Sequence, residues 1–318
     1  MHRFTSAAAA SCLVLAPGLD ASAQPAAGSR PIVRQDAMTR VSEHVYVIPD
    51  EYVGFVPNVG IVVGERATLI VDTGLGERNG EIVLGEARKV ADSDEFYVAA
   101  THFHPEHDLG ATAFPASARV VRWSAQQAEN EELGAQTIER FSGFSPIVAE
   151  LLEGAEHRAP DIVFEEQITL DLGGVQVRIT GVGPNHTRGD TVFFVEDDRV
   201  LFTGDVVMST FPSVSADYAD LDLWLENLDA FEALDPVAIV PAHGRMGGAE
   251  LIRRYREYLT SVREAVAGAR GQGRSPEDVS ASLAEDLAAR FVDLEPPSGP
   301  QMGRIDAAIR AAWREEGG

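Results

Sequence analysis

The sequence predicts an α/β fold in which two stacked β-sheets are covered by helices on both outer faces. Short β-branched runs punctuated by Gly and Asn alternate with stretches of helical periodicity. The chain also follows one plan twice: several strands, a helix, and then a strand that ends in histidine. With 318 residues, 45% of them hydrophobic, it is long enough to bury one large core.

The first half of this plan begins at residue 41. Four short β-branched runs are expected to form strands: 45–48, 53–55, 59–63 and 68–72. A helix at 79–90 carries its apolar residues on one face, and a buried strand at 96–100 leads directly into a histidine-rich segment. A short strand at 120–121 and a polar helical stretch at 124–157, broken near 142–146, complete the half.

The second half starts at Ile162 with another block of strands: 168–172, 175–180, 191–195 and 200–203. A helix at 221–234 and a strand at 238–241 follow. Three helices are expected after that: 249–269, 276–291 and 304–316. We expect residues 41–270 to form the main domain. Residues 271–318 are expected to form a helical C-terminal extension that serves as a lid, a dimer contact or padding.

The charge balance limits the classes of partner. A formal net charge of −24 repels phosphate backbones and anionic membrane surfaces, so no nucleic acid partner is expected. Lys89 is the only lysine. A fixed cation that recognises a substrate carboxylate would therefore be an arginine, although the arginine excess could equally reflect codon usage. The expected partner is a small-molecule substrate, and the oligomeric state stays open.

The first 23 residues have the pattern of a secretory signal peptide. Arg3 precedes an apolar stretch, 7–17, and the segment ends in the small-x-small pattern Ala21-Ser22-Ala23. The apolar stretch is too short to cross a bilayer, so cleavage and a periplasmic or secreted location are expected, without membrane insertion. A disordered alanine-rich tail is the alternative. Residues 24–40 are expected to be a linker, and cleavage would remove the only cysteine, Cys12.

The segment Thr101-His102-Phe103-His104-Pro105-Glu106-His107-Asp108 is the strongest chemical signal in the chain. Three histidines lie within six residues directly after a strand, and neutral imidazole is a good zinc ligand. A solvated, histidine-rich turn is the alternative. Further candidate ligands favour the metal site, because isolated His186, Asp205 and His243 also follow apolar strand runs.

These motifs resemble the metallo-β-lactamase superfamily, whose signature H-x-H-x-D-H is followed by isolated His, Asp and His ligands. The matching segments are Asp72-Thr73-Gly74, the histidine segment, GPNHTRGD with His186, LFTGD with Asp205 and IVPAHG with His243. They occur in the family order over residues 41–270. The resemblance implies a four-layer αββα sandwich of two mixed β-sheets flanked by helices.

The resemblance also implies two Zn²⁺ ions, with Fe or Mn as alternatives. One metal would be held by His102, His104 and His186. The other would be held by Glu106, His107 and His243, and Asp205 would bridge both. Such a pair lowers the pKa of a bridging water, and the hydroxide attacks the substrate. Asp72 resembles the family carboxylate that orients ligands, although an Asp before Gly also favours a turn.

Glu106 departs from the family pattern, which has Asp at this position. The additional methylene moves the carboxylate outward, and metal ligation tolerates only about 0.2 Å in bond length. Three outcomes are open. Glu106 ligates the second metal, acts as a catalytic general base, or weakens the second site. We favour ligation.

The residue type at the bridging position limits the classes of enzyme that the chain resembles. Asp205 replaces the cysteine of some β-lactamase subclasses, so the chain is similar to glyoxalase II, lactonases, sulfatases and phosphodiesterases. Arg188 and Arg245 are candidate anchors for a substrate carboxylate, with loop salt bridges as the alternative. Asn58 and its neighbours are candidates for lining the substrate pocket, although a packing role is at least as well supported.

The prediction is therefore an exported binuclear zinc hydrolase that attacks a small ester, lactam, lactone or thioester, with β-lactamase activity included. The alternatives are a sulfate or phosphate ester hydrolase, and a non-hydrolytic metal-binding accessory protein of a periplasmic system.

Overall fold

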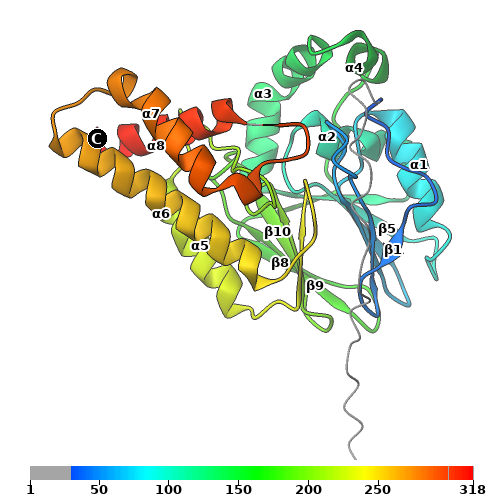
Figure 1. Ribbon diagram of the computed structural model, residues 1–318. Coiled ribbons are helices and arrows are strands. Elements are labelled where there is room, and N and C mark those ends of the chain that lie inside the picture. The colour runs from blue at the N-terminus through cyan, green and yellow to red at the C-terminus, as the bar shows by residue number, and fades with distance from the viewer. Residues whose placement is uncertain (1–29, 300, 318) are drawn as a thin grey trace, which may run out of the picture.

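Two β-sheets stack face to face and helices cover their outer sides, as predicted (Figure 1). This computed structural model describes residues 30–299 and 301–317. The predicted signal peptide lies outside these residues. Within the described part, no helix is long and apolar enough to cross a membrane.

The first sheet has seven strands in chain order: β1 (Thr39–Arg40), β2 (Val45–Ile48), β3 (Val59–Val63), β4 (Thr68–Val71), β5 (Phe96–Ala99), β6 (Arg119–Trp123) and β7 (Ile162–Phe164). Neighbours from β1 to β4 are antiparallel, and those from β4 to β7 are parallel.

The second sheet has five strands in the order β12-β11-β10-β9-β8. Their bounds are β8 (Gln167–Asp171), β9 (Gln176–Gly181), β10 (Thr191–Val195), β11 (Val200–Gly204) and β12 (Ala238–Pro241). The pairings are antiparallel except for β11 and β12, which are parallel. Both sheets are therefore mixed.

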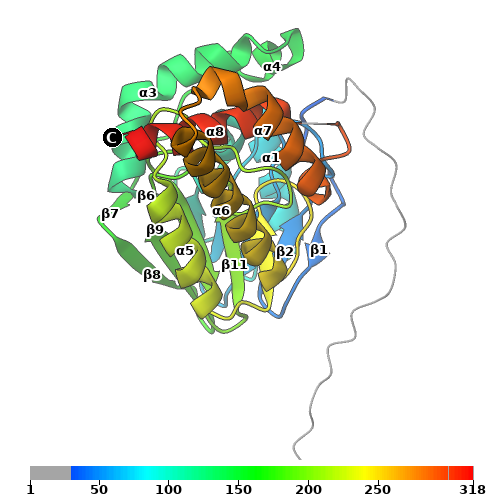
Figure 2. The ribbon, with the colours of Figure 1, turned by 60° about the vertical axis from the view of Figure 1, so that its left-hand side comes forward.

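The helices are α1 (Glu77–Ala87), α2 (Pro105–Asp108), α3 (Ser124–Ser142), α4 (Pro146–Leu151), α5 (Leu221–Ala233), α6 (Ala249–Gly271), α7 (Pro276–Arg290) and α8 (Met302–Gly317), with short 3-10 turns η1 (Leu109–Ala113) and η2 (Val292–Leu294). Helix α1 covers the first sheet, and α5 and α6 cover the second (Figures 1 and 2). Helices α7 and α8 pack against α6 and share its apolar cluster.

The alternation of side-chain direction along the strands explains the two apolar layers on either side of the second sheet. In β10, Phe193 and Val195 face the apolar cluster between the sheets, whereas Val192 and Phe194 face the cluster beneath the helices. Successive strand residues point to opposite faces, so a strand between two apolar layers is hydrophobic throughout. All five residues of β10 are buried.

Two expectations about the strands were wrong. Residues 53–55 form no strand, because the backbone turns there: Tyr52 and Phe55 both have positive φ, with Gly54 between them. Strand β7 lies beside β6 in the first sheet, although the sequence placed it at the start of the second block.

The candidate functional residues lie directly after the ends of the strands. Strands β4 and β5 are parallel in one sheet and β11 and β12 in the other, and each is followed by one of the motif residues. Gly204 lets the sheets approach there. Its φ is +56°, and a Cβ on it would lie 2.7 Å from the Cβ of Thr101. A side chain at this position would separate the end of β11 from the loop after β5.

Helix α1 offers a matched test of this close packing. A Cβ on buried Gly80 would lie 1.9 Å from the carbonyl oxygen of Gly110, whereas one on exposed Gly85 would meet nothing within 4 Å. We expect Gly80→Ala to reduce the free energy of unfolding by about 1–3 kcal/mol through overpacking. Gly85→Ala should leave it unchanged or raise it by up to about 1 kcal/mol through helix propensity. Denaturant unfolding of both variants measures this, and equal effects would contradict it.

Candidate metal centre

The histidine segment forms the loop after β5 and the short helix α2. Pro105 occupies the first helical position, where its missing N–H is not needed. The carbonyl of His107 accepts hydrogen bonds from the backbone N–H of Thr73, at 2.8 Å, and from its hydroxyl, at 3.0 Å. The loop after β4 therefore holds α2 in place.

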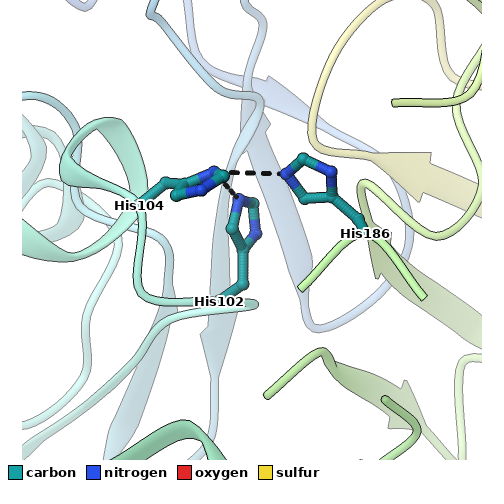
Figure 3. Close-up of side chains that lie close together, drawn as sticks. All are labelled: His102, His104 and His186. Atoms are coloured by element: carbon teal, nitrogen blue, oxygen red, sulfur yellow. Dashed lines mark hydrogen bonds between the residues drawn. The ribbon is translucent and has the colours of Figure 1, made fainter. Parts of the chain in front are cut away.

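His102, His104 and His186 point their ring nitrogens at one another (Figure 3). Nδ1 of His104 lies 3.0 Å from Nε2 of His102 and 3.2 Å from Nε2 of His186. Burial, together with the neighbouring imidazoles, lowers the pKa of both His102 and His104 well below the usual value. The lowered pKa values favour the neutral rings of His102 and His104, and nitrogens of all three rings converge on one point, the arrangement that a metal ion requires.

A second group lies beside the first and consists of Glu106, His107 and His243. Asp205 lies between the two groups: one carboxylate oxygen is 3.5 Å from Nε2 of His186, and the other is 3.8 Å from Nε2 of His243. This is the position that a bridging ligand would occupy.

Three buried atoms at this centre lack a hydrogen-bond partner among the described residues: Oε2 of Glu106, Nε2 of His107 and Oδ1 of Asp205. Leaving a buried polar group unpaired costs about 1–3 kcal/mol, and more for a charged one. Imidazole nitrogens and carboxylate oxygens are also the donors that zinc accepts. The residues therefore fit a pair of metal ions.

Asp72 connects the two ligand segments. Its Oδ1 accepts a hydrogen bond from the backbone N–H of Thr101 at 2.7 Å, and its Oδ2 accepts from the Thr101 hydroxyl at 3.1 Å. Oδ2 also lies 2.9 Å from Nδ1 of His107. Burial lowers the pKa of His107, but the carboxylate of Asp72 and the nearby acids outweigh it and raise that pKa to about 9. Asp72 thus holds His107 with Nε2 directed at the centre.

In three other histidines, the Nδ1 atom also lies beside a polar partner. Nδ1 of His102 lies 3.1 Å from the Thr101 hydroxyl, Nδ1 of His186 lies 2.6 Å from the Ser213 carbonyl, and Nδ1 of His243 lies 3.1 Å from the Val56 carbonyl. A donor Nδ1 leaves Nε2 free to bind metal. Sequence reasoning missed the carbonyl partners of His186 and His243, because any residue can supply a backbone carbonyl.

Glu106 lies at the candidate metal centre although its side chain is one methylene longer than that of the family's Asp. Its Oε1 is 3.9 Å from Nε2 of His107, and its carboxylate belongs to the group with His107 and His243. Burial raises its pKa, which disfavours the ionised form without a nearby cation. Its role as a ligand or a base stays a prediction.

The residues predicted to bind substrate have other contacts. Arg188 lies beside Glu129 and Glu132, at 3.4 and 2.8 Å, and Arg245 is exposed. Asn58 is buried: its amide donates to the carbonyls of Pro241 and Gly244, and its oxygen accepts from the backbone N–H of Asp50, all at 2.8 Å. It joins the loop before β3 to the loop that carries His243.

A cavity of about 230 Å³ opens beside the centre. Glu106 and His243 line it on the metal side, and Phe55 lines it from the loop before β3. Residues after α7, among them Arg304, line another part. The candidate centre is therefore reachable by a small molecule.

Known proteins similar to this chain are hydrolases. A linear primary-alkylsulfatase of Pseudomonas sp. (strain ATCC 19151) is 28% identical over 233 residues, which cover 63% of this chain and 43% of the sulfatase. A metallo-beta-lactamase type 2 of Bacteroides fragilis is 22% identical over 240 residues, which cover 73% of this chain and 88% of that protein. The chain thus spans less than half the length of the sulfatase.

Among solved structures, the inverting sec-alkylsulfatase Pisa1 from Pseudomonas sp. has the same fold. The TM-score is 0.65 at 15% identity, and the match covers 88% of this chain and 50% of the sulfatase. The family model of the metallo-beta-lactamase superfamily matches residues 52–243, more than half of the chain. The family-model match establishes that the chain belongs to the metallo-beta-lactamase superfamily, and the two-sheet sandwich agrees with it.

Proposed function

We propose that the protein is a binuclear zinc hydrolase and that it cleaves sulfate esters of apolar alcohols. His102, His104 and His186 would hold one ion, and Glu106, His107 and His243 the other, with Asp205 shared. Bound zinc lowers the pKa of water and polarises the ester oxygen. The converging ring nitrogens and the three unpaired buried atoms support this assignment.

The chain's own residues orient this centre and shield most of its ligands from solvent. Asp72 and Thr101 hold His107 and His102 in position through buried hydrogen bonds. Every candidate ligand is buried or half-buried, so electrostatic interactions with a developing negative charge are stronger there than in water.

An aromatic wall, defined as Phe55, Phe141 and Phe144, carries the proposal about the substrate. Phe141 lies 5.7 Å from the ring of His104, and it contacts Phe55 at 5.5 Å and Phe144 at 5.1 Å between ring centroids. Phe144 is 53% exposed, so the wall extends from the metal centre to solvent. An apolar alkyl group bound along it would leave water while its ester linkage lies at the centre.

The alkylsulfatase similarity supports the sulfate ester over the lactam and lactone alternatives. A thioester stays the competing substrate, because acyl-coenzyme A thioesterase MBLAC2 of Homo sapiens is 27% identical over 169 residues. The 28% identical relative is a linear primary-alkylsulfatase, an enzyme whose substrate combines an anionic ester with an alkyl chain. The aromatic wall fits the alkyl chain of such a molecule. The β-lactamase similarity is lower, at 22% identity.

The metal assignment predicts the zinc content of defined variants. The wild-type protein should hold close to two zinc ions per chain after dialysis, and His186→Ala about one. Asp72→Asn should weaken zinc binding by about 10- to 100-fold, because His107 loses its carboxylate partner. His44→Ala is the control, since His44 pairs with Asp198 outside the centre. Atomic absorption and chelator competition measure these values; a His186→Ala protein that keeps both ions would exclude the assignment.

The substrate assignment predicts a dependence on alkyl chain length. Zinc-loaded protein should hydrolyse octyl sulfate with a lower KM than ethyl sulfate. Phe144→Ala should raise the KM for octyl sulfate by about threefold to tenfold through lost apolar contact and leave that for ethyl sulfate unchanged. Val237→Ala is the control, because Val237 is similarly exposed, at 59%, and lies away from the wall. Turnover of nitrocefin or a thiolactone with no turnover of either sulfate would overturn the sulfate ester assignment. It would leave the assignment as a hydrolase in place.

Export is part of the same proposal and rests on the sequence pattern of residues 1–23 alone. Expressed from its first residue in a bacterial host, the protein should be recovered outside the cytoplasm with Gln24 as its first residue. N-terminal sequencing tests this. A cytoplasmic product that retains the segment would count against export.

A further inference from the structure

We propose that Arg304, on the C-terminal helix α8, binds the oxyanion of the substrate and that the segment after α7 thereby completes the active site. This inference rests on the proposed function, because it assigns a place to the sulfate group. It adds a residue outside the matched family region, which ends at residue 243.

The cavity beside the metal centre lies between two parts of the fold. Glu106 and His243 line it from the metal centre, and Ser298, Gln301 and Arg304 line it from the connection that leads into α8. The connection between α7 and α8 runs towards α2 in Figure 1. A molecule in this cavity would contact the metal ligands and the C-terminal segment together.

The guanidinium of Arg304 is fixed on one side and unpaired on the other. Nη1 donates to the carbonyl of Phe211 at 2.8 Å and to the hydroxyl of Thr210 at 3.3 Å. Both hydrogen bonds of Arg304 come from Nη1, and within the described part of the chain neither Nε nor Nη2 has a hydrogen bond or a carboxylate partner. The Nε–Nη2 edge is the one that binds two oxygens of an oxyanion in parallel.

The positive charge of Arg304 matters because the protein as a whole is strongly acidic. Among the described residues that line the cavity, Arg304 is the only arginine or lysine, in a chain with a net charge of −24. An anionic substrate is repelled by the acidic surface unless a local cation offsets that charge. Arg304 is also close enough to lower the pKa of both Asp205 and His243, in addition to larger effects of burial and neighbouring groups.

Gln301 adds a second polar group at the same place. It lies three residues before Arg304, one helical turn away, and also lines the cavity. Its side-chain oxygen is buried without a hydrogen-bond partner among the described residues. Rotation of the amide by half a turn would place its NH₂ group at the position of this unpartnered oxygen, and in this proposal that group is a second donor to the oxyanion.

Sulfate binding by zinc-loaded protein tests the inference without turnover. We expect calorimetry with inorganic sulfate to give a dissociation constant about 10- to 100-fold higher for Arg304→Gln than for the wild type, the range for a charge-assisted hydrogen bond. Arg304→Lys should give an intermediate value, because it keeps the charge and loses the paired donors. Arg310→Gln removes a cation from the exposed side of the same helix and should bind sulfate like the wild type.

Zinc content and melting temperature separate anion binding from a purely structural role. The Nη1 contacts hold residues 210 and 211, so loss of both zinc and thermal stability in Arg304→Gln and Arg304→Lys alike would overturn the inference. Equal sulfate affinity of wild type and Arg304→Gln, or no measurable affinity in the wild type, would do so too. Arginine-dependent sulfate binding without hydrolysis of any sulfate ester would instead support the anion site and refute the proposed reaction.

Discussion

The buried carboxylate of Asp72 is the interaction on which the centre depends. It lies directly after β4 and accepts hydrogen bonds from the backbone and side chain of Thr101, which follows β5. It also pairs with His107 on α2. Burial of a carboxylate is unfavourable unless it is fully hydrogen-bonded, so this position strongly favours one arrangement of the three segments. Asp72 adopts φ of +63°, a conformation that Asp tolerates better than most residues. The adjacent parallel strands bring the segments together, and the carboxylate sets their orientation.

The second sheet must then approach closely enough to supply Asp205 and His243. Gly204 allows the close contact with Thr101, and Asn58 ties the loop before β3 to the loop after β12. The buried carboxylate of Asp50 accepts a hydrogen bond from the backbone N–H of Gly244, next to His243. Polar contacts across the top of the sandwich thus fix the distance between the ligands of the two sheets. The apolar cluster between the sheets supplies the attraction that brings them together.

Local patterns made the two sheets and the cluster of candidate ligands predictable. Each motif follows an apolar run, and the order of the motifs resembles that of the metallo-β-lactamase superfamily, so the histidines and Asp205 were expected to meet. The turn at residues 53–55 was missed because the aromatic residues Tyr52 and Phe55 adopt positive φ, a backbone conformation that such residues rarely occupy. The partners of His186 and His243 are backbone carbonyls, which have no sequence signature. The place of Arg304 depends on how α7 and α8 pack on α6, and no motif records that packing.

Charge connects the metal centre to the C-terminal helices. Without metal, the centre contains the carboxylates of Asp72, Glu106 and Asp205 in an already acidic molecule, and an anionic substrate would be repelled. Two divalent cations, as proposed, would outweigh the carboxylates of Glu106 and Asp205 and make the centre positive. Arg304 would then extend this positive region along the cavity, while the aromatic wall leads away from it to solvent. An alkyl sulfate has the matching polarity, because its charge is confined to one end. The two surfaces would therefore orient the ester bond between them before any chemical step begins.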